Sequence, residues 1–131
     1  MNLQLKDTKI TNMVLASSSE EAGSDPIQNL EFSPGYFEES DSEFVVRFKI
    51  SLITEENVSL KIDFEALFGT DEPLTSEFKE SHFPRVNAPA IAYPFLRSVI
   101  SNTLLQAGYQ PIILPAINFT RAVRVEEGSE A

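Results

Sequence analysis

The chain has no cysteine, no tryptophan, one histidine and only five glycines among its 131 residues. Without cysteine it forms neither disulfides nor thiolate metal sites, which suits a reducing cytoplasm. The few glycines do not cluster, so a phosphate-binding loop is not expected. No apolar run approaches the ~18 to 20 residues of a membrane helix, and Lys6, Asp7 and Lys9 lie where a signal peptide would be apolar. We therefore expect a cytoplasmic protein without direct membrane insertion.

Basic residues are also scarce, because ten lysines and arginines stand against twenty acidic residues, for a formal net charge of -10. This charge repels phosphate, so nucleic acid is not an expected partner. An acidic chain attracts basic, often unfolded, segments, although many proteins are acidic without having such a role.

Side chains that carry catalysis do not gather in the sequence. The only histidine, His82, lies in a polar stretch beside Phe83 and Pro84, and a lone histidine is most often a surface residue. Acid–base chemistry with paired carboxylates needs two of them converging on one pocket. The carboxylate pairs here are adjacent in sequence and fall in expected turns: Glu20-Glu21, Glu38-Glu39, Glu55-Glu56 and Glu126-Glu127. The sequence thus predicts no enzyme, no cofactor and no metal site.

Alternating apolar residues predict four strands. In the clearest strand every second residue from Phe44 to Leu52 is apolar, and a similar run over residues 58–65 follows a hairpin-length connection at 54–57. Residues 2–16 predict a strand with a bulge or a crossing within it, and residues 28–32 a short strand that ends at the Ser-Pro-Gly of residues 33–35. Such strands predict an antiparallel sheet with one covered face and one wet face.

Helices are expected after the strands. Residues 70–82 are ambiguous between a loop and one helical turn, and the main helix is expected over 89–107. Asn87 is its candidate cap, and Pro94 either kinks it or marks its true start. Gly108 is expected to end the helix in a left-handed conformation, before an apolar loop at 109–117 and a short helix beginning at Asn118. The apolar stripe of the main helix comprises Phe95, Leu96, Val99, Ile100 and Leu104.

The order of these elements favours an α+β fold over a wound parallel sheet. We expect a four-stranded antiparallel sheet followed by one long helix and a short C-terminal helix. A single domain is expected over residues 1–125, with an acidic, disordered tail at 126–131.

The run from Asn87 to Phe119 has one charged residue, Arg97, on an otherwise strongly acidic chain. One helix covers a sheet face only partly, so we expect an oligomer. The surplus apolar side chains are predicted to form a groove for extended apolar segments. The alternative is a minor core beneath a loop. The side chains concerned are Leu30, Phe32, Tyr36, Phe37, Ile112, Ile113, Leu114, Ile117 and Phe119.

At these residues the chain resembles the SecB protein-export chaperone family. The match is strongest in NAPAIAYPFLRSVISN followed by GYQPIILPAINF. Family members show a similar aromatic-Pro-aromatic-x-Arg start of the helix, here YPFLR at 93–97, then a Gly-aromatic stop. A Leu-Pro…Asn-Phe ending follows, here Leu114-Pro115 and Asn118-Phe119. The resemblance covers residues 83–119 well, the strands more loosely and residues 66–82 poorly.

The resemblance implies a homo-oligomer, a dimer of dimers joined through first strands and main helices. It implies that the protein binds unfolded or precursor polypeptides without ATP and delivers them to the translocation ATPase. It places Leu30 and Phe32 in the groove from the second strand, with Ile112, Leu114, Ile117 and Phe119 from the loop and last helix. For the oligomer interface it implies Leu3, Leu5, Ile10, Arg97, Ser101, Asn102 and Leu105.

The chain departs from the family in two places. The last helix is usually longer, whereas here the helical pattern fades at 123–126. In well-known members the ATPase docks on acidic residues of the first strand, and residues 10–16 contain no acid. Since some branches serve a single antitoxin, a dedicated chaperone is the second interpretation. A small-ligand-binding or catalytic domain of the same shape is the third.

Overall fold

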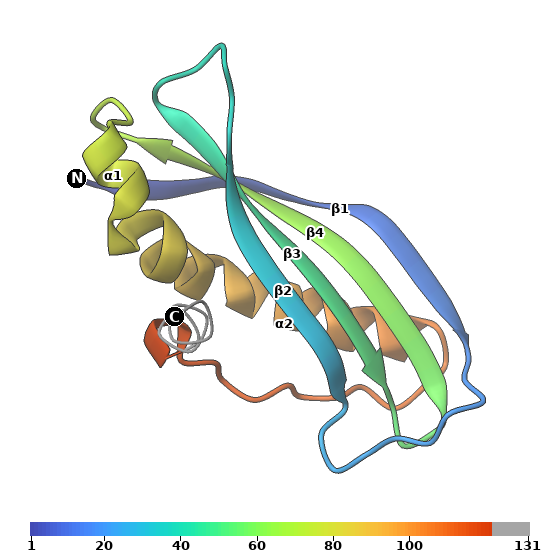
Figure 1. Cartoon of the computed structure of the whole chain (residues 1–131). Helices are drawn as coiled ribbons and strands as arrows, with labels where there is room; N and C mark the ends of the chain where they lie inside the picture. Colours follow the sequence, from blue (N-terminus) through green and yellow to red (C-terminus); the bar gives the residue numbers. More distant parts are fainter. Residues whose placement is uncertain (122–131) are drawn as a thin grey trace.

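The structure, a computed structural model, describes residues 1–121 as one antiparallel sheet with helices on one face (Figure 1). The strand order is β1-β4-β3-β2, so β1 and β2 are the edges. The expected α+β architecture is confirmed, while the predicted tail at 126–131 lies outside the described residues. The elements are β1 (Leu3–Ser17), β2 (Ile27–Tyr36), β3 (Glu43–Ile53), β4 (Val58–Thr70), α1 (Ser76–Glu80), a π-helical turn η1 (Phe83–Asn87) and α2 (Ala88–Gln106).

Strand β1 contains two bulges, which explains its irregular apolar pattern. The pairing with β4 skips one residue between Leu5 and Asp7 and another between Ile10 and Asn12. Each extra residue reverses the alternation, because successive side chains of a strand point to opposite faces. As a result Leu5, Ile10 and Leu15 all lie on the face that carries α2, since they oppose inward-facing β4 residues. The predicted bulge is confirmed.

Strand β2 runs past its predicted end. Ser33, Pro34 and Gly35 continue to pair with β3 instead of forming a turn. Proline is tolerated here because β2 is an edge strand. On the side of β2 that faces away from β3 there is no neighbouring strand, so a missing amide there costs no hydrogen bond of the sheet. A Cβ atom at Gly35 would lie 2.5 Å from Nη1 of Arg47, so the flexible Arg47 side chain would have to shift to admit any other residue.

The β3–β4 hairpin turns at residues 54–57, as predicted. Asn57 has a positive φ of 59°, a conformation that asparagine tolerates better than most residues. Its amide donates to the carbonyl of Thr54 at 2.9 Å, and the amide of Thr54 donates to the carbonyl of Val58 at 3.0 Å.

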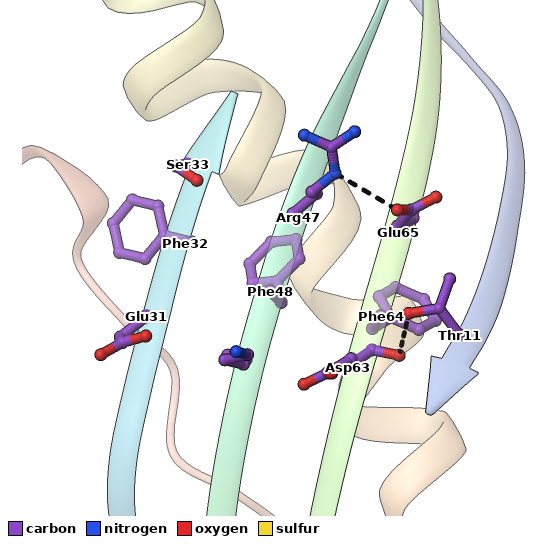
Figure 2. Close-up of a pocket in the computed structure, with 10 residues that line it drawn as sticks. Thr11, Glu31, Phe32, Ser33, Arg47, Phe48, Asp63, Phe64 and Glu65 are labelled. Atoms are coloured by element: carbon purple, nitrogen blue, oxygen red, sulfur yellow. Dashed lines mark hydrogen bonds and ion pairs between the residues drawn. The ribbon is translucent and has the colours of Figure 1, made fainter. Parts of the chain in front are cut away.

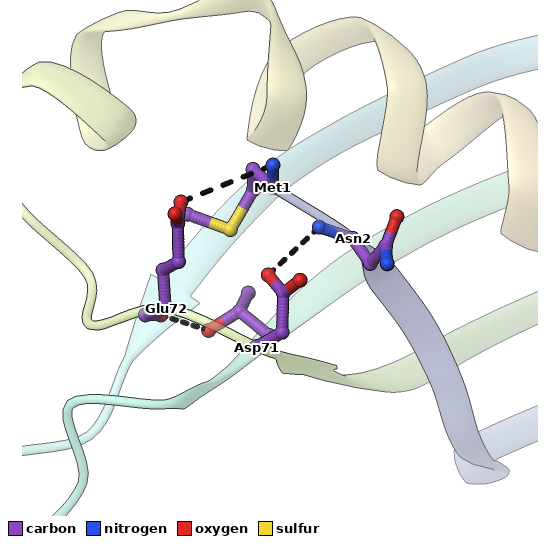
Figure 3. A network of polar contacts seen from close by, with 5 residues as sticks. Met1, Asn2, Asp71 and Glu72 are labelled. Atoms are coloured by element: carbon purple, nitrogen blue, oxygen red, sulfur yellow. Dashed lines mark hydrogen bonds and ion pairs between the residues drawn. The ribbon is translucent and has the colours of Figure 1, made fainter.

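The amino-terminal segment is tied to the loop after β4 (Figure 3). The amide of Asn2 donates to Asp71 Oδ1 at 2.8 Å, and the amino group of Met1 lies 3.9 Å from Glu72 Oε2. The hydroxyl of Thr70 donates to the carbonyl of Glu72 at 2.6 Å, which holds this loop against the end of β4.

Helix α2 confirms the predicted main helix, with Pro94 inside it. Two details of the prediction are wrong. Asn87 makes no capping bond, because it is itself helical at the end of η1. Phe95 is 50% exposed. The buried stripe of the helix runs instead through Tyr93, Leu96 and Ile100, and Phe95 lies beside it.

Gly108 ends α2 as predicted, with a φ of +97°. Its amide donates to the carbonyl of Leu105 at 3.1 Å, and the amide of Tyr109 donates to the carbonyl of Leu104 at 2.9 Å. This pair of bonds is the Schellman arrangement, which requires a left-handed residue at the glycine position.

One helix does not cover the sheet, and residues 110–118 supply the rest of the cover. Four strands span roughly 15 to 19 Å, whereas a helix is about 10 Å wide. Figure 1 shows α2 lying along one face and the following segment returning along the same face. Leu114 from this segment and Phe119 just after it belong to the buried core, together with Leu96 of α2 and Phe48 and Phe64 of the sheet.

Candidate functional site

Phe119 joins three parts of the molecule at the β2 side of the core. Its ring meets the Phe32 ring of β2 edge-on, with centroids 4.9 Å apart, and the Tyr93 ring of α2 at 5.6 Å. Phe32 in turn lies 6.2 Å from Phe48 of β3. Residues 119–121 are helical and Asn118 Oδ1 accepts the amide of Arg121 at 3.0 Å, so the predicted short helix begins where expected.

Six of the predicted groove residues lie on this side of the sheet and pack on one core. The segment before Phe119 is extended, and its side chains alternate. Ile113 is 93% exposed, whereas Leu114 is 2% exposed and Phe119 is 3% exposed. The remaining residues of this group are half-buried: Leu30, Phe32, Ile112 and Ile117. We call these six residues, with Leu114 and Phe119 included, the apolar cluster.

Tyr36 and Phe37 lie away from these six residues. Tyr36 faces the same core at the other end of β2, where its ring lies 6.1 Å from that of Phe44. Phe37 follows in the chain and lines a small hollow of about 180 Å³ with Val45 and Leu67, on the opposite face of the sheet. Sequence spacing alone did not separate them, because the predicted strand ended before either residue.

A hollow of about 490 Å³ opens beside Ile112, at the start of the 110–118 segment. The linker after β1, the β3–β4 hairpin and residues 110–113 line it. Ile53 and Ile113 contribute apolar surface, and Glu55 and Glu56 contribute carboxylates. Glu56 Oε1 accepts the amide of Gln110 at 2.7 Å, which fixes the start of the 110–118 segment.

The opposite face of the sheet is polar and carries a second hollow of about 380 Å³ (Figure 2). Arg47 Nε donates to Glu65 Oε1 at 3.2 Å, and the hydroxyl of Thr11 donates to the carbonyl of Asp63 at 3.3 Å. An exposed ion pair of this kind contributes about 0 to 1 kcal/mol. Within residues 1–121, no three His, Cys, Asp or Glu side chains are arranged to hold a metal ion.

Two buried tyrosines have perturbed acidity. Burial raises the pKa of Tyr93, although the nearby guanidinium of Arg97 partly opposes the shift. Burial also raises the pKa of Tyr36, against the opposing charge of Arg85. Each shift disfavours the phenolate because a buried charge loses its hydration.

The predicted oligomer-interface residues fall into three groups. Leu3 and Leu5 are half-buried and pack on the core of the same subunit. Ile10 and Leu105 are 41% and 57% exposed. In the third group, Arg97 and Ser101 donate to backbone carbonyls of the 110–118 segment, and Asn102 donates to Ser98.

Sequence reasoning missed two exposed side chains of α2, Ile91 at 41% and Phe95 at 50%. With Asn102 and Leu105 they stand at successive spacings of four, seven and three residues, which mark a helix seam. This spacing was visible in the sequence. It was obscured because Phe95 also fits the buried stripe.

Within residues 1–121, no helix combines the length and the hydropathy that crossing a bilayer requires.

Comparison with known proteins gives a consistent result. The family model described as preprotein translocase subunit SecB matches residues 4–127. A protein-export protein SecB from Bradyrhizobium sp. (strain BTAi1 / ATCC BAA-1182) is 25% identical over 122 residues, covering 92% of this chain and 75% of the relative. One from Ralstonia pickettii (strain 12J) is 53% identical over 34 residues, covering 26% of this chain and 20% of the relative.

A solved structure shows the same fold. It is a SecB-like chaperone of Mycobacterium tuberculosis in complex with a ChAD peptide from an antitoxin. The TM-score is 0.63 at 20% sequence identity, and the match covers 88% of this chain and 89% of that chain.

Proposed function

Because this chain belongs to the SecB family, whose members are chaperones rather than enzymes, we propose that the apolar cluster forms a client groove, in which the chain holds unfolded polypeptides without ATP. In this proposal it acts in the cytoplasm, needs no cofactor and has no catalytic activity of its own. The observation that carries the proposal is the set of large apolar side chains gathered between β2 and residues 110–118.

Such a groove suits clients of varied sequence. Apolar burial is non-directional and contributes about 1.5 to 3 kcal/mol for each large side chain that is fully buried. Half-buried Phe32, Ile112 and Ile117, with exposed Ile113, offer this surface without demanding a fixed pattern of hydrogen bonds. The client class is therefore extended segments rich in apolar and aromatic residues.

The charge of the chain adds a second preference. Glu55 and Glu56 line the hollow at the end of the groove, on a chain with a formal net charge of -10. Opposite charges attract and like charges repel across such a surface. Clients with basic residues flanking their apolar segments are therefore favoured over acidic ones.

The proposed assembly is a dimer of dimers. Strand β1 is an edge strand of 15 residues, and an unpaired edge of this length favours pairing with another strand. Exposed Met13 and Val14 on β1, with Phe95 and Leu105 on α2, supply apolar surface for contact with other subunits. The family resemblance implies an interface on the same two elements.

A dedicated partner is the second candidate. The SecB-like chaperone with the same fold carries a peptide from an antitoxin. In addition, the β1 residues that face away from the core at Asn12, Val14 and Ala16 contain no acid. The one acidic residue of β1 is Asp7, nearer its start, so a site for the translocation ATPase on residues 10–16 would have to differ from the acidic one expected for the family. Delivery to that ATPase belongs to the first candidate only.

The test is a binding titration with several unrelated unfolded proteins, each labelled and kept unfolded by reduction and alkylation. A general chaperone binds most of them with similar affinity. A dedicated chaperone binds none of them tightly but binds a peptide from one cognate partner. If neither kind of ligand binds to the folded oligomer, the proposed function is wrong.

A further inference from the structure

Three side chains on one face of α2 hold the segment that covers the client groove. Ser101 Oγ donates to the carbonyl of Ile112 at 3.0 Å, and Tyr93 Oη donates to the carbonyl of Pro115 at 3.0 Å. Between them, Arg97 Nη1 donates to the carbonyl of Leu114 at 3.4 Å. The segment thus runs antiparallel to the helix, along the row of residues 93, 97 and 101.

The spacing of this row matches an extended chain. Residues four apart on a helix rise by about 6 Å, and two residues of an extended strand advance by about 6.6 Å. Carbonyls of alternate residues in an extended chain point the same way, so those of Ile112 and Leu114 meet Ser101 and Arg97 in turn. Tyr93 departs from this alternation, because it bonds to the next residue along the segment, Pro115.

Few other polar contacts attach this segment. Among residues 1–121, no backbone-to-backbone hydrogen bond joins residues 110–118 to the rest of the chain. Pro111 and Pro115 have no amide to donate. The amide of Gln110 bonds to Glu56 at the near end. Side chains therefore supply the directional contacts, with three of these bonds coming from α2.

The closed segment hides part of the groove that it helps to form. Leu114 and Phe119 are 2% and 3% exposed, so a client reaches them only when the segment moves away from the core. A site whose competent state is only partly populated binds with an affinity reduced by that fraction.

We propose that Tyr93, Arg97 and Ser101 are positioning residues that latch residues 110–118 over the client groove, and that client binding requires this latch to open. The inference rests on the proposed function and adds how access to the groove is controlled. Arg97 and Ser101 thereby act within the subunit. Loss of one neutral hydrogen bond shifts an equilibrium by about fivefold, so the bond from Tyr93 and the bond from Ser101 each hold client affinity down by about that factor.

The test compares Ser101→Ala and Tyr93→Phe with a matched control, Ser98→Ala. Ser98 lies on the same helix, and its hydroxyl accepts a bond from Asn102 instead of holding the segment. Because Ser98→Ala makes the same chemical change, it corrects for altered helix propensity. Ser101→Thr keeps the hydroxyl and should restore wild-type behaviour.

Two measurements separate the latch from a purely structural role. The first is the rate of native-state chymotrypsin cleavage after Phe119, which is buried in the closed form and is followed by Thr120, so that cleavage there reports opening without any client. The second is the dissociation constant for a labelled, permanently unfolded protein. We expect both latch variants to be cleaved about fivefold faster and to bind the client up to about fivefold more tightly, while their melting temperatures fall.

Faster cleavage with unchanged or weaker client binding would overturn the latch and leave the proposed function standing. Cleavage no faster than in Ser98→Ala would also overturn it. A changed oligomeric state in Ser101→Ala alone would assign that residue to the subunit interface instead. If wild type and all variants bind no client, the proposed function fails, and the control of access fails with it.

Discussion

The ring of Phe32 on β2 meets the ring of Phe119 edge-on, with centroids 4.9 Å apart. The first residue is half-buried, whereas the second is 3% exposed and belongs to the core. A single aromatic contact therefore links the proposed client surface to the packing that holds the fold together. Substitutions in the groove affect stability as well as binding, and the two effects must be measured separately.

Phe119→Ala should destabilise the fold strongly. The side chain is buried against Phe32 and Tyr93, and removal of a buried phenylalanine costs about 3 to 5 kcal/mol. Phe32→Ala should cost less, because part of that ring is already in contact with water. Urea denaturation measures both free energies of unfolding. Equal losses for the two variants would mean that Phe119 is not the buried member of the pair.

Leu105→Glu should dissociate the oligomer while the subunit stays folded. The side chain is 57% exposed on α2, so a carboxylate there is tolerated by an isolated subunit but not inside an apolar interface. Sedimentation measures the mass, and circular dichroism measures the fold. Gln106→Glu adds the same charge at the next exposed position and serves as control. Identical masses for wild type and Leu105→Glu would exclude this residue from the interface.

Gly108→Ala should lower the free energy of unfolding by about 1 kcal/mol. Gly108 has a φ of +97° at the end of α2, and an L side chain is strained there even though space is open around it. Gly23→Ala is a suitable control, because that glycine has open space without the positive φ. If the two substitutions have the same effect on the urea midpoint, the helix end does not depend on glycine.

Stability should fall as the pH rises above about 10, the ordinary pKa of tyrosine. Burial raises the pKa of Tyr36 and Tyr93, so the folded state keeps these protons after the unfolded state has lost them. Because the unfolded state then binds fewer protons, the free energy of unfolding decreases with pH above the unfolded pKa and is unaffected by these groups below it.

The double variant Tyr36→Phe, Tyr93→Phe should show a flatter decline in the urea midpoint over this range. At neutral pH the two single variants should differ in their free energy of unfolding. Tyr36 Oη is buried and, within the described chain, has no hydrogen-bond partner, so its loss should cost little. Tyr93→Phe gives up the bond to Pro115, worth about 1 kcal/mol. An unchanged pH slope in the double variant would contradict the assignment to these tyrosines.

Strands β3 and β4 and helix α2 were predictable because each carries a strong local period. Alternation fixed the two central strands, and Gly108 fixed the end of the helix. The continuation of β2 through Pro34 was not predictable, since proline tolerance depends on the strand lying at the sheet edge. That position is set by the pairing of all four strands rather than by local residues.

The site was less predictable than the fold. Composition identified the apolar residues of the 110–118 segment, but the alternation between exposed Ile113 and buried Leu114 follows from where the segment lies on the core. The bonds from Tyr93, Arg97 and Ser101 to backbone carbonyls leave no mark in the sequence, because every residue has a carbonyl. The resemblance predicts Arg97 and Ser101 at the oligomer interface, and the structure adds their bonds to residues 110–118 within the subunit.

Suppression of client aggregation is the most direct test of whether the client groove holds unfolded polypeptides. A chemically unfolded protein is diluted into buffer with increasing amounts of the oligomer, and light scattering is followed. We expect the wild-type protein to suppress light scattering at a near-stoichiometric ratio to the client. We also expect the double variant Phe32→Ser, Ile117→Ser to lose this suppression, provided that circular dichroism and sedimentation show an intact fold and assembly. Phe37→Ser, on the opposite face of the sheet, reports whether clients also contact that face. If a well-folded wild-type oligomer fails to suppress aggregation, the proposed holding of clients in the groove is wrong.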